Sequence, residues 1–152
     1  MGRLSKIMAV LIGLGLAAGC SDSLEEMPRD EARATVRKIA AEAFRQQFGE
    51  LPAPLSESET GCDSAQTNDL PDAYVAHGVW ESPLAAEDHE RIMIELRNGS
   101  SRFKSMLTPL GDGRFALDGY DTETGFDFSV TSGEPPSAVR LTVSSPCLLA
   151  SD

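Results

Sequence analysis

The sequence is poor in the residues and motifs that most enzymes use. Of its 152 residues, 6% are aromatic, two are histidines and three are cysteines. It has no HExxH zinc motif, no GxSxG nucleophile turn and no phosphate-binding Walker loop. These absences exclude the enzyme classes that are recognised by such motifs. We therefore expect a non-enzymatic protein without a cofactor.

Basic residues are also scarce. Lysine and arginine together number 13 against 24 acids, which gives a formal net charge of −11. A nucleic-acid-binding protein needs a basic surface, so a nucleic-acid partner is excluded. The same acidic balance opposes binding of the protein surface to anionic lipid.

The N-terminus has the pattern of a secretory signal peptide. Arg3 and Lys6 precede the uncharged, largely apolar run Ile7–Ala18, and small residues follow. A helix of this length spans about 18 Å at ~1.5 Å per residue. A bilayer core of ~30 Å needs about 20 residues. We therefore predict a cleaved leader over residues 1–19 and not a membrane-spanning helix.

The residues Leu16-Ala17-Ala18-Gly19-Cys20 resemble the lipobox of bacterial lipoproteins. The resemblance implies that Cys20 becomes the first mature residue and carries lipid on its sulfur. Two or more acyl chains anchor a protein stably to a membrane. The expected location is the outer leaflet of the cytoplasmic membrane, or the outer membrane in a Gram-negative cell.

Two further cysteines, Cys62 and Cys147, remain after Cys20 is used. Thiols oxidise outside the cytoplasm, so we predict a Cys62–Cys147 disulfide. It would close a loop of roughly 86 residues, worth roughly 4–5 kcal/mol in the chain-entropy model. The alternative is a reactive or metal-binding pair, although neither cysteine lies in a CxxC motif or near a histidine.

After the leader, residues 20–27 read as a polar tether and residues 28–152 as one domain. A first helix is predicted from Pro28 to the stop at Gly49, with one apolar stripe. Ser82 and Pro83 predict the start of a second helix, which ends at Asn98-Gly99. Between the two helices we expect a strand over residues 73–81 and a short edge strand near Cys62.

The chain after the second helix is rich in alternating apolar and polar residues. Strands are predicted over residues 103–108, around Phe115 and Leu117, over 126–131 and over 139–144, separated by turn sequences such as Gly111-Asp112-Gly113. The predicted fold is α+β: an antiparallel sheet of about four to six strands, with two helices packed on one face and a single disulfide.

This order of features is similar to that of many small, mostly uncharacterised lipoproteins of actinobacteria. The residues that carry the resemblance are Cys62, Trp80, Gly99, Asp112-Gly113, Gly125-Phe126 and Ser145-Pro146-Cys147. It spans nearly the whole mature chain. It implies a fold and a disulfide and gives no activity.

Few residues are candidates for a catalytic or metal-binding role. His77 lies mid-strand and His89 on the apolar stripe of the second helix, and for both a structural role is expected. Four acids near one turn are the alternative candidate for a calcium site, although the EF-hand spacing is absent and solvated turn residues are the default. They are Asp118, Asp121, Glu123 and Asp127.

Three arginines, Arg29, Arg33 and Arg37, recur at every fourth residue on the first helix. A solvated face is expected for this row, with contact to lipid headgroups as the alternative.

The leading functional hypothesis is a membrane-anchored envelope module that binds an envelope protein, a cell-wall component or a small ligand. One alternative is a small envelope hydrolase that uses His77 with an acid such as Asp127. The other is a purely structural envelope lipoprotein.

Overall fold

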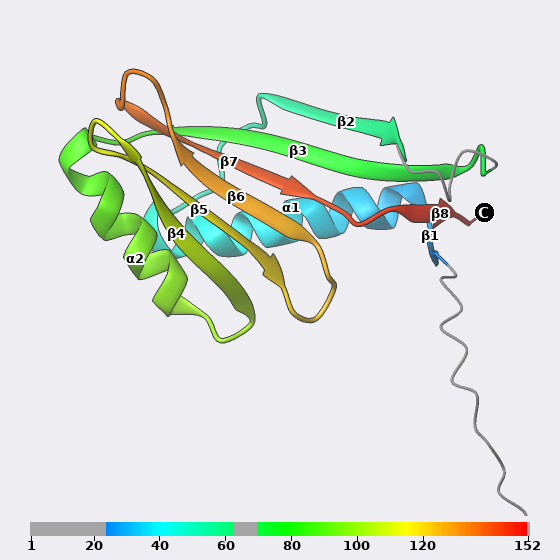
Figure 1. Cartoon of the computed structure of the whole chain (residues 1–152). Coiled ribbons are helices and arrows are strands. Elements are labelled where there is room, and N and C mark those ends of the chain that lie inside the picture. Colours follow the sequence, from blue (N-terminus) through cyan, green and yellow to red (C-terminus); the bar gives the residue numbers. More distant parts are fainter. Residues whose placement is uncertain (1–23, 63–69, 152) are drawn as a thin grey trace, which may run out of the picture.

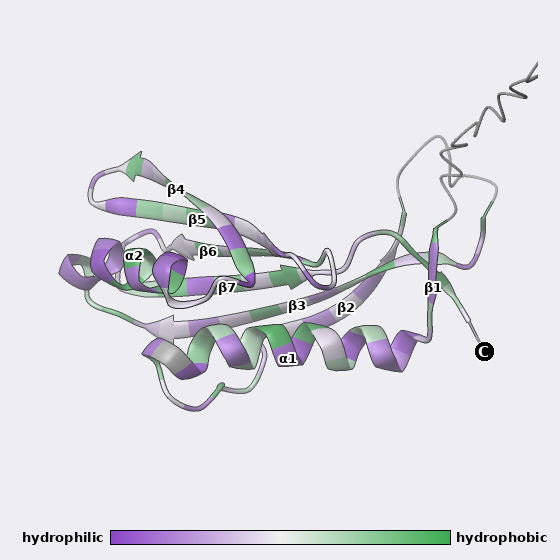
Figure 2. Ribbon diagram, turned by 90° about the horizontal axis from the view of Figure 1, so that it is seen from below, coloured by the Kyte–Doolittle hydropathy of each residue, from purple (hydrophilic) through white to green (hydrophobic). Residues whose placement is uncertain are grey.

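The computed structural model describes residues 24–62 and 70–151. Two α-helices, α1 (Arg29–Gln47) and α2 (His89–Gly99), lie on one face of an eight-stranded sheet (Figures 1 and 2). A 3-10 turn, Ala86–Asp88, precedes α2. The strands are β1 (Glu25–Met27), β2 (Ser56–Gly61), β3 (Ala73–Pro83), β4 (Phe103–Gly111), β5 (Arg114–Asp121), β6 (Asp127–Ser132), β7 (Ala138–Ser144) and β8 (Leu148–Ala150).

The centre of the sheet is the predicted antiparallel meander. Strands β4, β5, β6 and β7 pair in sequence order, and β7 then pairs with the long strand β3. The other edge of β3 carries β2, the expected edge strand before Cys62. The α+β class is therefore confirmed.

The strand count exceeds the predicted four to six. The additional strands are β1 and β8, three residues each, which pair in parallel with one another. A three-residue strand is too short to show an alternating pattern, so sequence periodicity cannot reveal it. Strand β1 also brings Glu25–Met27, which we had assigned to the tether, into the folded sheet.

The predicted start of the second helix is wrong. Ser82 and Pro83 continue β3, where they lie opposite Val139 and Ala138 of β7. The cap-and-proline pattern is a local signal, and strand pairing overrides it here. Proline is tolerated because it stands at the last position of the strand.

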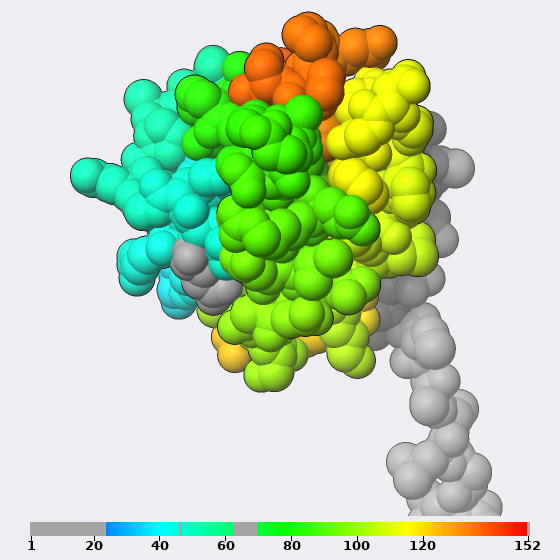
Figure 3. Space-filling view, turned by 90° about the vertical axis from the view of Figure 1, so that its left-hand side faces the viewer, coloured from blue at the N-terminus to red at the C-terminus, as the bar shows by residue number. Residues whose placement is uncertain are grey.

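The core lies between the helices and the sheet. Tyr74, Ala76 and Trp80 of β3 point toward α1, as do alternate residues of β7, and alternate residues of β6 are buried in the same core. The hydrophobic stripe of α1, which includes Val36 and Ile39, is buried against them. Helix α2 covers β4 and β5 instead, and Figure 3 shows it between the α1–β2 side of the molecule and the β4–β5 hairpin.

One glycine allows α1 to lie close to the sheet. A Cβ atom on Gly78 of β3 would lie 2.3 Å from Cη2 of Trp80 and 2.8 Å from Cγ1 of Val36. The missing side chain leaves space for the indole ring of Trp80, which is 1% exposed.

The predicted disulfide is present. Cys62, directly after β2, is bonded to Cys147, directly before β8, with 5.8 Å between the two Cα atoms. It ties the early edge strand to the last part of the chain. The leader and Cys20 lie outside the described residues.

Candidate functional site

The face of the sheet opposite α1 and α2 is polar, and we call it the open face. Side chains alternate between the two faces of a strand, so strand register aligns open-face residues of neighbouring strands. One such row crosses six strands: Ser58, His77, Ser144, Asp127, Tyr120 and Lys104. A second row lies beside it: Ser56, Val79, Thr142, Ser129, Asp118 and Met106.

His77 lies on the open face between two hydroxyl groups. Its Nδ1 is 2.9 Å from Oγ of Ser144, and its Nε2 is 3.0 Å from Oγ1 of Thr60. Asp127 lies opposite Ser144 and not opposite His77. The ring thus forms a Ser–His contact, but within residues 24–62 and 70–151 no carboxylate bonds to its second nitrogen.

A hollow of about 360 Å³ lies on the open face over β5, β6 and β7. Its lining combines two carboxylates, a phenol ring and three hydroxyl groups. The residues are Asp118, Gly119, Tyr120, Asp127, Phe128, Ser129, Thr142 and Ser144. Convergent polar groups around a concave surface are the usual features of a small-molecule site.

Within the hollow, Ser129 donates a hydrogen bond to the carboxylate of Asp118, with 2.6 Å between the oxygens. Tyr120, the penultimate residue of β5, is 44% exposed.

The four acids considered for calcium do not converge. Asp118 and Asp127 are on the open face, whereas Asp121 points into the interior and is 0% exposed. Glu123 belongs to the turn after β5 and contacts Arg102. Across the described parts of the chain, no group of three His, Cys, Asp or Glu residues is arranged to hold a metal ion. Solvated turn residues were the default expectation, and for Asp121 that expectation is wrong.

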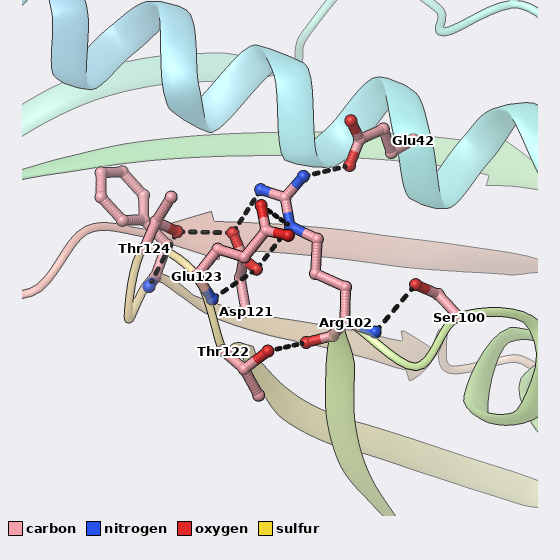
Figure 4. A network of polar contacts seen from close by, with 8 residues as sticks. Glu42, Ser100, Arg102, Asp121, Thr122, Glu123 and Thr124 are labelled. Atoms are coloured by element: carbon pink, nitrogen blue, oxygen red, sulfur yellow. Dashed lines mark hydrogen bonds and ion pairs between the residues drawn. The ribbon is translucent and has the colours of Figure 1, made fainter.

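Asp121 instead forms the centre of a polar network on the α1 side of the sheet (Figure 4). Arg102 donates two hydrogen bonds to its carboxylate, from Nε at 2.6 Å and from Nη2 at 2.5 Å. The remaining nitrogen of Arg102 reaches Glu42 of α1 at 3.1 Å. Thr124 and the backbone N–H of Glu123 also donate to Asp121. The network connects α1, the start of β4 and the β5–β6 turn.

This network shifts the pKa values of both ionic partners. Burial by itself raises the pKa of Asp121, but the hydrogen bonds from Arg102, Thr124 and the Glu123 backbone outweigh burial and lower it to about 2. The hydrogen bond to Asp121 raises the pKa of Arg102. Both groups are therefore charged at neutral pH.

His89 has the structural role expected for it. It is 0% exposed, and its Nε2 lies 3.0 Å from the carbonyl oxygen of Leu84. Because a carbonyl only accepts, Nε2 carries the proton, and Nδ1 lies 2.7 Å from Oγ of Ser132. Ser132 also accepts the backbone N–H of Phe115. His89 thus joins α2 to the sheet and faces no open space.

The arginine row on α1 is about half exposed to solvent, as expected for a solvated face, and each of its arginines also forms an ion pair. Arg37 donates to both carboxylate oxygens of Glu57, at 2.7 and 2.6 Å. Arg29 and Arg33 both pair with Glu59. Hydrogen bonding to Arg37 lowers the pKa of Glu57. The row holds the polar edge strand β2 against α1.

Comparisons with family models, curated proteins and solved structures found no match for this chain. No helix within the described ranges has the length and hydropathy needed to cross a membrane.

The hollow could not be located from the sequence. Its residues come from three strands and most of them are polar, so in sequence they resemble ordinary solvent-facing strand positions. Two of them, Asp118 and Asp127, are candidates from the sequence for a metal site, and Asp127 is also the candidate acid partner of His77 in the hydrolase alternative. Arg102 had no sequence signal for its role, because its partner lies 19 residues further along the chain.

Proposed function

We propose that this protein is an exported, lipid-anchored envelope module that binds a small ligand on the open face of its sheet. The observation that carries the binding role is the hollow over β5, β6 and β7, where polar groups converge around an exposed tyrosine. The lipobox-like sequence that ends at Cys20 supports the anchor. The disulfide supports an oxidising compartment.

The anchor would keep the domain close to the membrane. Three residues separate Cys20 from Leu24, the first described residue, so the two Cα atoms are at most about 14 Å apart. Strand β1 then starts almost at once. An acidic domain held at this distance is repelled by anionic headgroups, which favours binding from the aqueous side.

The hydrolase alternative receives partial support from the contact between His77 and Ser144. A serine nucleophile also needs an oxyanion hole and a group that orients the histidine. Backbone N–H groups within a sheet point toward neighbouring strands, so they are not aimed at a ligand above the face. The second nitrogen of His77 meets Thr60 and not a carboxylate. We therefore favour binding over hydrolysis.

The anchor is tested by labelling cells with an alkyne fatty acid and by fractionating their membranes. The wild-type chain should incorporate label and sediment with membranes, and the Cys20→Ala variant should do neither. A wild-type chain that stays unlabelled and soluble would rule out the anchor.

The binding role is tested by NMR on the full chain in detergent micelles, titrated with a small-molecule extract of the cell envelope. Saturable shifts confined to β5, β6 and β7 are expected. Shifts that are absent, or that fall mainly on α1 and α2, would overturn the open face as the binding surface.

A further inference from the structure

We infer that the hollow binds a small organic cation, whose primary ammonium group lies between Asp118, Asp127 and the ring of Tyr120. This inference rests on the proposed function, because it names the ligand class of the same surface.

The register places the three side chains next to one another. Asp127 of β6 lies directly opposite Tyr120 of β5, a relation that brings Cβ atoms to about 4.5–5.5 Å. Asp118 precedes Tyr120 by two residues on β5, so it shares the face at a spacing of about 7 Å. The phenol ring thus has one carboxylate beside it along the strand and another across the strand pair.

The electrostatics of the hollow favour a cation. Its lining includes two carboxylates and no basic residue. In the described part of the chain, neither Asp118 nor Asp127 forms an ion pair, and Arg140 on the same face is paired with Glu81 at 3.2 Å. The two carboxylates, on neighbouring strands and without a basic partner, repel each other. A cation bound between them would relieve that repulsion. An anionic ligand would increase it.

The tyrosine is an observation independent of the two acids. Its ring is 44% exposed and lines the hollow. An aromatic face attracts an ammonium group through its quadrupole and also covers the methylene groups attached to it. The volume of about 360 Å³ suits a small molecule.

The test compares three ligands of matched length with the full chain in detergent micelles, followed by NMR. They are 1,5-diaminopentane, the neutral 1,5-pentanediol and the dianion glutarate. The diamine should give saturable shifts around the hollow that weaken as salt is raised, because exposed charges are screened. The diol and glutarate should leave these resonances unchanged.

Substitutions in and near the hollow test where the cation binds. Asp127→Asn should weaken diamine binding about tenfold, whereas Asp112→Asn, the same charge change at the β4–β5 hairpin tip, should have little effect. Tyr120→Leu should weaken binding roughly threefold to fivefold, and Tyr120→Phe should retain it. Lys104 lies opposite Tyr120 on β4, so Lys104→Gln should strengthen binding.

The two proposals fail in different ways. If the diol binds the hollow as tightly as the diamine, or if Asp112→Asn weakens binding as much as Asp127→Asn, the cation inference is wrong and the open-face binding role survives. If neither the diamine nor the envelope extract shifts any open-face resonance, both are wrong.

Discussion

At the residue scale, the Arg102–Asp121 pair is the most consequential polar interaction in the described domain. The carboxylate of Asp121 has no exposure to solvent, so its charge is tolerated only because several donors surround it. Neutralising Asp121 leaves Arg102 paired with Glu42 and Glu123, but it takes the anionic acceptor away from two donors of Arg102 and from Thr124.

Asp121→Asn should therefore lower the free energy of unfolding by about 2–3 kcal/mol, the range for hydrogen bonds to a charged group. Asp118→Asn is the matched control on the same strand, and because its side chain is exposed it should cost less than about 1 kcal/mol. Urea denaturation measures both. Equal losses in the two variants would show that the buried pair has no special role.

The lowered pKa of Asp121 also predicts how stability changes in acid. The folded-state pKa of about 2 lies below the ordinary value of 3.8, so ionised Asp121 stabilises the fold above pH 4. This contribution is lost as the pH falls from about 4 to about 2. The free energy of unfolding of the wild type should drop more steeply over this window than that of Asp121→Asn. Parallel curves would contradict the assignment.

At the element scale, the distance between α1 and β3 depends on Gly78. A side chain here would overlap the ring of Trp80 and the methyl group of Val36, and both lie in the core. The helix cannot move away without exposing the apolar surface that it shares with the sheet.

Gly78→Ala should lower the melting temperature and cost about 1–3 kcal/mol of stability through overpacking. Gly61→Ala in β2 is the control, because nothing lies within 4 Å of a Cβ atom there. It should change stability by less than about 0.5 kcal/mol. Calorimetry of both variants distinguishes overpacking at Gly78 from an effect that any glycine-to-alanine change in a strand would have.

At the scale of the whole molecule, the disulfide links the end of β2 to the start of β8. Cys62 and Cys147 are 85 residues apart in sequence, so the bond constrains most of the unfolded chain. The ion pairs between α1 and the glutamates of β2 hold the same edge without a covalent bond.

The double variant Cys62→Ser, Cys147→Ser should lose about 4–5 kcal/mol in the chain-entropy model. Urea unfolding of the variant, compared with the wild type under oxidising and reducing conditions, measures this loss. Reduction of the wild type should reproduce the effect of the double variant. A reduced wild type as stable as the oxidised form would contradict a stabilising role.

Much of the fold was predictable because periodicity is a local property. The stripe of α1, the alternation of β3 and the turns of the meander are all visible in short windows of sequence. The start of α2 was missed because Ser82 and Pro83 carry a strong local helix signal, while their pairing with β7 depends on residues more than 50 positions away.

The sequence by itself determined the acidic charge and was enough to predict the α+β class, since both depend on composition or local periodicity. It also predicted the disulfide, because only two cysteines remain once Cys20 is assigned to the lipobox-like segment. Only the tertiary structure decided which acids lie together. Strand register brings Asp127 next to Tyr120, and the folded chain gives Arg102 its partner Asp121. Register is set by packing between strands distant in sequence, so no short window of residues encodes it.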